Sequence, residues 1–320
     1  MRKARFQTER RKALKVKIFV AVLAAAMTLT VFSGCAQVEE EVPEVTEVTV
    51  EEVQPYPVTI GSLVFNAAPE TVGSLSPAIT DIIAELGFAD KLVGVSSYCS
   101  FDGMSSTLAD LGSSANPDAD AIIKAAPELI ISHSPIAKKD ITAIESAGTR
   151  VLIIPAPTSV DGLYDLYHDI YRIFRGSDEN EETAVSSCFE KLERSFANYD
   201  GVLGNYVYIM SSKLAFASDS SFGGDFFSHL GKNAAAEEEG ISLTKERLLE
   251  LDPEYIIIPS GMKKSRLPEE LSAVKNGRVI RLDKETEQLL ERPTSEVCKA
   301  ADFIAAAIKV LDEPEQTDGE

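Results

Sequence analysis

The sequence predicts an α/β protein with two Rossmann-like lobes that are joined by a long rigid helix and have a ligand cleft between them. In both halves of the chain, apolar runs of about four residues alternate with helical patterns of about ten, which is typical of parallel sheets with crossover helices. Residues 160–200, between the two halves, show helical periodicity. Ligands of such folds usually bind where domains meet and at the carboxyl ends of parallel strands.

The N-terminus has the three parts of an export signal. Residues 1–17 carry eight Lys or Arg and one acid, residues 18–33 are uncharged, and Ser33-Gly34 precedes Cys35. A basic segment, a short apolar segment and small residues before a cleavage point predict a secretory signal peptide at 1–34. A single-pass anchor is the alternative, but the apolar segment is shorter than the roughly 20 residues that a span needs.

Ser33-Gly34-Cys35 resembles a bacterial lipobox, with Phe32 where Leu is usual. The Cys35 thiol would then carry a diacylglycerol. Because each buried CH₂ contributes about 0.8 kcal/mol, several acyl chains would hold the protein at the membrane. The resemblance implies an extracytoplasmic location with Cys35 as the lipidation site.

An acidic tether and an acidic tail flank the rest of the chain. Residues 36–57 hold seven Glu, three Pro and no Lys or Arg, and the last ten residues, LDEPEQTDGE, are similar. Such segments cannot bury a core and are expected to be extended or frayed. We therefore predict a lipidated Cys with its tether at 35–57 and a tail at 312–320.

The mature chain is strongly acidic. The net charge of the whole chain is −20, and removal of the signal peptide, with eight bases and one acid, makes it about −27. This charge argues against nucleic acid as a partner. Cys99, Cys188 and Cys298 remain, an odd number without a CxxC pair. A Cys188–Cys298 disulfide is one interpretation, and buried free thiols are the favoured one.

The N-terminal lobe, residues 58–159, is predicted from four strands and three helices. Ser76-Pro77 and Asn116-Pro117 each place a capping side chain before a Pro at the first helical position. The predicted strands are Ser62–Asn66, Leu92–Val95, Leu129–Ser132 and Val151–Ile154, and the helices are Pro77–Leu86, Pro117–Ala125 and Lys138–Ala147.

Connecting helices are predicted at 160–200. Apolar residues recur at helical spacing from Val160 to Arg175 and again from about Asp178 to Tyr199, with Gly176 between them. About 40 residues of nearly continuous helix would form a stiff connector that allows little domain closure.

In the C-terminal lobe, residues 201–311, predicted strands again alternate with predicted helices. Its predicted strands are Tyr206–Met210, Tyr255–Pro259 and Val279–Leu282, and its helices are Gly224–Leu230, Lys245–Leu251 and Pro293–Leu311.

Four stretches carry a family resemblance. They are NAAPETVGSLSPAITDIIAELGFADKLVGVSSYCSF, LGSSANPDADAIIKAAPELIISHS, GISLTKERLLELDPEYIIIPSG and LSAVKNGRVIRLD followed by ERPTSE. Together they resemble the helical-backbone substrate-binding proteins of ABC importers, which deliver ferric siderophores, cobalamin or heme, and the match runs from about Asn66 to Ile308. The resemblance implies a monomeric binding protein with no cofactor of its own, a metal chelate as ligand and a permease dimer as partner.

The resemblance also implies functional residues. One acid on each lobe would pair with arginines of the permease, and these fall on Asp120, where Glu is usual, and Glu246. As first-turn acids, both would in any case complement a helix dipole. The implied ligand contacts, on loops facing the cleft, are Ser76, Pro77, Tyr98, Phe222, Asp225 and Arg292. A guanidinium at Arg292 would pair with carboxylate or catecholate oxygens, although ordinary packing explains each residue taken alone.

Other functions are weighed against this one. No GxSxG, HExxH, Walker loop or GxGxxG is found, and His133, His168 and His229 are scattered, which disfavours an enzyme. A bare metal ion needs three or four convergent ligands, and His168 falls on the connecting helices. Heme is a further alternative, because His229 or Tyr98 could ligate iron. A ferric siderophore is the favoured ligand, followed by cobalamin.

Overall fold

The computed structural model describes residues 54–99 and 107–312, which belong to one unit of the chain. The predicted signal peptide, Cys35, most of the tether and the end of the tail lie outside these residues. Within the described part, no helix combines the length and the apolar character needed to cross a membrane.

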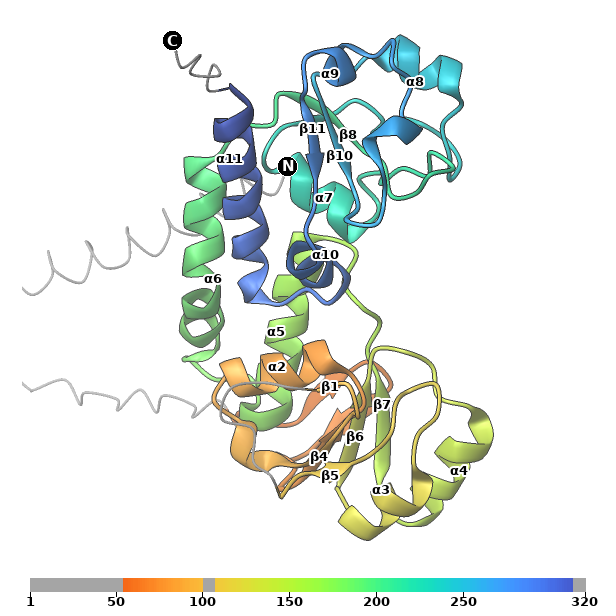
Figure 1. Cartoon of the computed structure of the whole chain (residues 1–320). Coiled ribbons are helices and arrows are strands. Elements are labelled where there is room, and N and C mark those ends of the chain that lie inside the picture. The colour runs from red at the N-terminus through yellow and green to blue at the C-terminus, as the bar shows by residue number, and fades with distance from the viewer. Residues whose placement is uncertain (1–53, 100–106, 313–320) are drawn as a thin grey trace, which may run out of the picture. The chain divides into compact units, whose positions relative to one another are not determined.

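The N-terminal lobe is built on a five-stranded parallel sheet with the order β5-β4-β3-β6-β7 (Figure 1). In sheet order the strands are β5 (Ala109–Asp110), β4 (Leu92–Val95), β3 (Val72–Ser74), β6 (Leu129–Ser132) and β7 (Arg150–Ile153). The helices of this lobe are α2 (Pro77–Glu85), η1 (Ala89–Lys91), α3 (Ala119–Ala125) and α4 (Lys138–Ser146). The parallel sheet predicted for this lobe is therefore confirmed.

One predicted strand of that sheet is wrong. The run Ser62–Asn66 forms β2 (Leu63–Phe65), which pairs antiparallel with β1 (Val58–Ile60) in a separate hairpin. The central strand is instead β3, which the apolar pattern missed because it contains Gly73. A Cβ at Gly73 would lie 2.5 Å from the side chain of Ile130 and 2.7 Å from that of Leu111, so the tight packing of the sheet requires glycine there.

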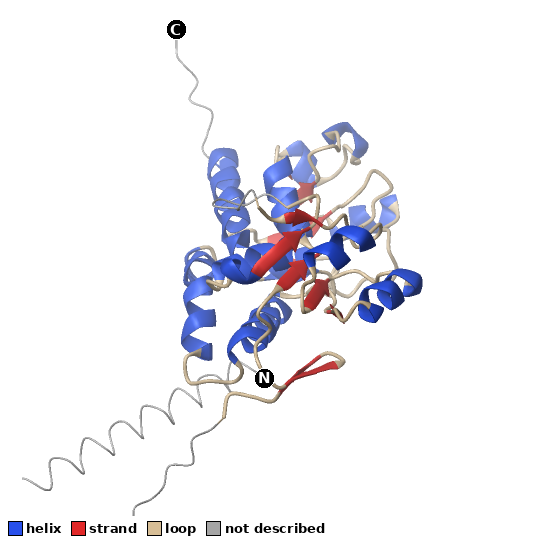
Figure 2. Ribbon diagram, turned by 90° about the horizontal axis from the view of Figure 1, so that it is seen from below, coloured by secondary structure: helices blue, strands red, loops and turns tan. Residues whose placement is uncertain are grey.

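The C-terminal lobe has a four-stranded parallel sheet with the order β11-β10-β8-β9. In sheet order the strands are β11 (Val279–Arg281), β10 (Tyr255–Ile258), β8 (Asn205–Tyr208) and β9 (Lys232–Asn233). The helices are α7 (Phe222–Ser228), α8 (Lys245–Leu251), η2 (Lys264–Arg266), α9 (Ser272–Lys275), α10 (Lys284–Glu291), η3 (Ser295–Val297) and α11 (Cys298–Asp312). In Figure 2 helices lie on either side of the strands.

The connector is a helical hairpin rather than 40 residues of nearly continuous helix. Helix α5 (Val160–Arg175) ends at Gly176, whose φ of +69° is left-handed, and α6 (Glu181–Asn198) then runs back along α5. The Tyr164 ring of α5 stacks on the Phe189 ring of α6 with a centroid distance of 3.8 Å. The helical character of this connector is confirmed, but the reversal at 176–180 makes it two helices that pack side by side.

One hydrophobic cluster includes residues of both sheets and of α5 and α6. It contains Val72 and Leu129 of the N-terminal sheet, Tyr167 of α5, and Tyr206 and Tyr255 of the C-terminal sheet. Separate clusters cover the other face of each sheet. Because a fully buried apolar side chain contributes about 1.5–3 kcal/mol, tilting either lobe away from α5 would be costly.

The ends of the folded part differ from the predictions in detail. The end of the predicted tether is held in place: Pro55 O accepts from Ser177 N at 2.8 Å, and the Tyr56 hydroxyl donates to Ile173 O at 3.0 Å. Helix α11 continues through Asp312, the first residue of the predicted tail, where the Asp312 carboxylate accepts from the Tyr255 hydroxyl at 2.9 Å.

Two predicted helix caps are also wrong. Helix α3 is capped by Asp118, which accepts from Ala121 N, and not by Asn116. The Ser76 side chain precedes α2 but makes no capping hydrogen bond, although Pro77 stands at the first position of that helix as expected.

Candidate functional site

The N-terminal sheet has a topological switch point between β3 and β6. From β3 the chain adds β4 and β5 on one side, and then crosses to place β6 and β7 on the other. In open α/β sheets, ligands bind outside the carboxyl ends of the strands at this point. Ser76 follows β3, and His133 follows β6. Their loops are joined there, because the backbone N–H of His133 donates to Ser76 Oγ at 2.8 Å.

Ser76 is buried, and its hydroxyl oxygen accepts the hydrogen bond from the His133 N–H. The side chain therefore fixes the spacing of the two loops, and its predicted ligand contact stays a prediction.

His133 stands at this edge, and the sequence analysis did not select it as a candidate site residue. Its Nδ1 lies 2.8 Å from Ile154 O, so Nδ1 carries the hydrogen and Nε2 presents a lone pair. Nε2 is buried and has no hydrogen-bond partner among the described residues. Burial lowers the pKa of the imidazole, which keeps His133 neutral and an acceptor. No motif marks this residue, since its role depends on strands that meet only in the fold.

Tyr98 stands at the same edge, three residues after β4 ends. Its side chain is 67% exposed, which is unusual for an aromatic residue in an ordered turn. Beside it, Cys99 Sγ lies 3.3 Å from the Thr80 hydroxyl of α2. The Tyr98 side chain is thus open to solvent, and its ligand contact stays a prediction.

In the C-terminal lobe, Phe222 and Asp225 lie on α7, with different environments. Phe222 is buried, and its ring packs near that of Phe226. Asp225 Oδ2 accepts from the backbone N–H of Val160, the first residue of α5, at 2.7 Å. Burial raises the pKa of Asp225. Both side chains have structural contacts, and no contact joins either to Tyr98.

Arg292 is the residue that follows α10 in the C-terminal lobe. It is exposed, and burial raises the pKa values of Asp81 on α2 and of Cys99 beside Tyr98, against a smaller opposing effect of the Arg292 charge. Burial is the larger effect on Asp81 and raises its pKa to about 6. The ligand contacts of Tyr98 and Arg292 stay predictions.

His229, the heme ligand considered above, has a packing role in this structure. Its ring stacks on Phe196 of α6 with a centroid distance of 4.4 Å, and its Nε2 lies 3.9 Å from Asp225.

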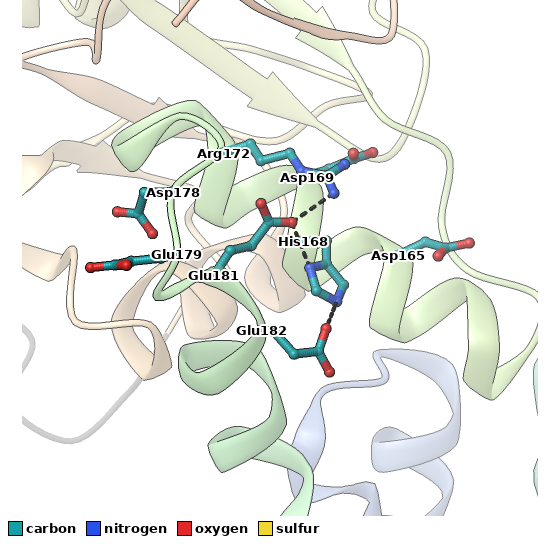
Figure 3. A pocket seen from close by; sticks show the side chains of 8 residues that line it. All are labelled: Asp165, His168, Asp169, Arg172, Asp178, Glu179, Glu181 and Glu182. Atoms are coloured by element: carbon teal, nitrogen blue, oxygen red, sulfur yellow. Dashed lines mark hydrogen bonds and ion pairs between the residues drawn. The ribbon is translucent and has the colours of Figure 1, made fainter. Parts of the chain in front are cut away.

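A cavity of about 670 Å³ lies away from these residues, between α5 and α6 (Figure 3). The Glu181 carboxylate bridges two of the side chains that line this cavity, because one of its oxygens lies 2.8 Å from His168 Nδ1 and 2.6 Å from Arg172 Nη2. Its lining residues are Asp165, His168, Asp169, Arg172, Asp178, Glu179, Glu181 and Glu182. In the described part of the chain, neither these side chains nor others form a group of three or more that could hold a metal ion.

The two predicted docking acids occupy equivalent positions in the two lobes. Asp120 and Glu246 are each the second residue of a seven-residue helix whose preceding side chain caps it. Each helix ends at a left-handed residue, Ala126 or Asp252, which is followed by Pro, Glu and the strand that pairs with the first strand of its sheet. Both acids are exposed, and neither has an ion pair with another described residue.

Comparisons with known proteins agree with this architecture. Residues 72–286, more than half of the chain, match the periplasmic binding protein family, and the chain belongs to that family. A cobalamin-binding protein of Halobacterium salinarum is 23% identical over 272 residues, which cover 80% of this chain and 71% of that protein. An uncharacterized ABC transporter substrate-binding lipoprotein of Bacillus subtilis, YvrC, is 25% identical over 293 residues, which cover 83% of this chain and 89% of the relative.

The solved structures show the same fold. A possible iron-binding, periplasmic solute-binding protein from Staphylococcus epidermidis has a TM-score of 0.61 and 20% identity, covering 75% of this chain and 98% of that one. The family resemblance of the sequence and the predicted two-lobed α/β fold are thereby confirmed.

Proposed function

We propose that this chain is the lipid-anchored, extracytoplasmic substrate-binding protein of an ABC importer and that it delivers a metal chelate to a permease dimer. The observation that carries the proposal is the exposed Tyr98 ring at the carboxyl edge of the N-terminal sheet, and the exposed guanidinium of Arg292 would lie at the same site. An aromatic ring and a guanidinium at one site suit a ligand with flat apolar surface and anionic oxygens.

A ferric siderophore is the first choice among ligands. Catecholate or carboxylate oxygens around iron would pair with Arg292, and the organic shell would lie against Tyr98. Recognition through the shell needs no protein ligand to the metal itself. The exposure of both side chains supports direct contact.

Cobalamin is the second choice. It is supported by the name of the Halobacterium relative, a cobalamin-binding protein. Its amide side chains would supply N–H donors for an acceptor such as His133 Nε2. Heme remains an alternative that would use Tyr98, since His229 is stacked on Phe196.

The equivalent positions of Asp120 and Glu246 support the partner. A permease dimer offers two similar surfaces, and a binding protein with one acid in the same local setting on each lobe matches them. Helix stability alone is a weak reason for an acid at both positions, because an acid in the first turn stabilises its helix by only about 0.3–1 kcal/mol.

Ligand titrations test this proposal. The chain has no Trp, so tyrosine fluorescence reports on its own residues, and the probes are a ferric tris-catecholate, a ferric trihydroxamate, cyanocobalamin and hemin. We expect one chelate to bind with Kd at or below about 1 µM, and Tyr98→Ala to weaken it by roughly 1–3 kcal/mol while Tyr98→Phe binds almost normally. Failure of all four probes, or recovery of a chemically altered ligand, would overturn the proposal.

A further inference from the structure

Tyr208 differs from the other buried tyrosines in the described part of the chain. Each of the others donates a hydrogen bond from its hydroxyl: Tyr167 to Glu85, Tyr171 to Asp178, Tyr206 to the backbone oxygen of Gly224, and Tyr255 to Asp312. Tyr208 is only 9% exposed, yet its hydroxyl makes no hydrogen bond with any residue that the structure describes. Because a buried tyrosine usually pairs its hydroxyl, a partner from outside the chain is expected here.

The position of Tyr208 in the C-terminal sheet points to a ligand as that partner. Tyr208 is the last residue of β8. From β8 the chain adds β9 on one side, and then crosses to place β10 and β11 on the other. This is the switch point of the C-terminal sheet, as the end of β3 is in the N-terminal sheet, and ligands bind outside the carboxyl ends of the strands at such points.

Helix α7 fixes the ring of Tyr208. A Cβ at Gly223, the second residue of α7, would lie 3.1 Å from Tyr208 Cε1, so the ring lies close to bare backbone at the start of this helix. The ring of Phe227 meets it edge to face, with a centroid distance of 5.2 Å and an interplanar angle of 88°. A side chain held in this way loses little conformational freedom when it binds a ligand.

The hydroxyl of Tyr208 is a hydrogen-bond donor at neutral pH. Burial, with the negative charges of Glu287 and Glu291 on α10, raises the pKa of Tyr208 to about 12, so the phenol stays protonated. Glu287 is fixed in turn, because the N–H and the hydroxyl of Ser260, after β10, donate to its two carboxylate oxygens at 2.8 and 2.5 Å. The elements around the hydroxyl are therefore held together before any ligand arrives.

We propose that the Tyr208 hydroxyl donates a hydrogen bond to an oxygen in the organic shell of the ligand and is thus a ligand contact of the C-terminal lobe. The inference rests on the proposed function, because the ligand is the chelate delivered to the permease. A catecholate, carboxylate, hydroxamate or amide carbonyl oxygen would accept this hydrogen bond. Tyr208 would not ligate the metal itself, because ligation requires the tyrosinate and the phenol stays protonated.

The first test needs no ligand. Tyr208→Phe removes only the hydroxyl, and Tyr206→Phe is the matched control on the same strand, where the lost hydroxyl has a partner in the chain. In urea unfolding, we expect Tyr208→Phe to be at least as stable as wild type and Tyr206→Phe to be less stable. A loss of stability in Tyr208→Phe equal to that in Tyr206→Phe would overturn the inference, because the hydroxyl would then serve the fold.

The second test measures ligand affinity in the same proteins. The probes are the four of the proposed function: a ferric tris-catecholate, a ferric trihydroxamate, cyanocobalamin and hemin. The chelate that wild type binds most tightly should bind Tyr208→Phe about three- to tenfold more weakly, as expected for one lost hydrogen bond. Its affinity for Tyr206→Phe should stay within about twofold of wild type.

A third measurement reports on the hydroxyl directly. In wild type labelled with ¹³C at tyrosine Cζ, the Tyr208 signal is assigned by its absence from Tyr208→Phe, and gallium(III) replaces paramagnetic iron in the probes. Saturating ligand should shift the Tyr208 signal more than the Tyr206 signal, and an unshifted Tyr208 signal would refute the contact.

The outcomes separate this inference from the proposed function. If a chelate binds wild type and Tyr208→Phe equally well, the inference alone is wrong. If none of the four chelates binds wild type, the proposed function is wrong and the inference fails with it.

Discussion

The carboxylate of Asp225 accepts a hydrogen bond of 2.7 Å from the backbone N–H of Val160. Val160 is the first residue of α5, so its N–H has no partner within the helix. Ser159 Oγ accepts from Gly162 N at 3.0 Å, and the two side chains together satisfy the start of the helix that both lobes share. A residue that the resemblance marks as a ligand contact therefore has a structural function.

This bond predicts a loss of stability in Asp225→Ala. Removing the acceptor leaves a half-buried N–H unsatisfied, at a cost of about 1–3 kcal/mol. Asp225→Asn keeps an acceptor oxygen and should lose less. Urea unfolding measures both, with Asp200→Ala, at an exposed carboxylate, as the control. A free energy of unfolding equal to wild type in Asp225→Ala would contradict this role.

Asp81 should make stability depend on pH. Burial raises its pKa to about 6, so the folded state binds the proton more tightly than the unfolded chain. The contribution of Asp81 to the free energy of unfolding is fully present at low pH, where the group is protonated in both states. It is lost as pH rises from about 4 to about 6. Asp81→Asn should therefore match wild type near pH 4 and exceed it at pH 7.5 by about 1 kcal/mol, a value reduced for solvent screening. A stability difference that stays constant between pH 4 and 8 would exclude the effect.

His133 should serve as a hydrogen-bond acceptor for ligand. In His133→Asn the amide nitrogen can replace Nδ1 as donor to Ile154 O, but nothing replaces Nε2. If a ligand donor uses Nε2, this variant should bind about five- to thirtyfold more weakly, because a hydrogen bond contributes about 1–2 kcal/mol. His133→Gln, which can restore an acceptor near Nε2, is the matched control. Unchanged ligand affinity in His133→Asn would remove His133 from the site.

Asp120 and Glu246 should contribute to transport and not to ligand affinity. The double change Asp120→Ala/Glu246→Ala should abolish uptake while the ligand Kd stays within about threefold, or 0.7 kcal/mol. Glu145→Ala/Glu190→Ala removes two other exposed acids and should leave uptake intact. Normal uptake by the first variant would show that docking uses other residues.

Cys35 should hold the protein at the membrane. If Ser33-Gly34-Cys35 is processed as a lipobox, Cys35→Ser should be released or left unprocessed, and a palmitate analogue should label wild type only. Equal labelling of both proteins would point to a different anchor.

Long helices with regular apolar spacing were predictable, because the spacing lies within one continuous stretch of the sequence. The apolar stripe of α5 follows a helical spacing, and hydrophobic burial selects that spacing in most contexts. The strands β4, β6 and β10 were found as short apolar runs because sheets covered on both faces exclude polar residues. In contrast, β3 was missed, since Gly73 is required by packing against residues that are distant in the chain.

By itself, the sequence determined the α/β class, the alternation of elements in each lobe, the helical middle and the family. It also supplied Tyr98 and Arg292 as predicted ligand contacts. The tertiary structure decided the reversal after Gly176, where the close approach of Pro55 leaves no room for a Cβ. It also decided the hydrogen-bond partners of Glu85 and His133. Glu85 and Ser295 are 210 residues apart in the chain. A local sequence pattern cannot predict a hydrogen bond or a pKa shift across such a separation, because burial and charge act through space.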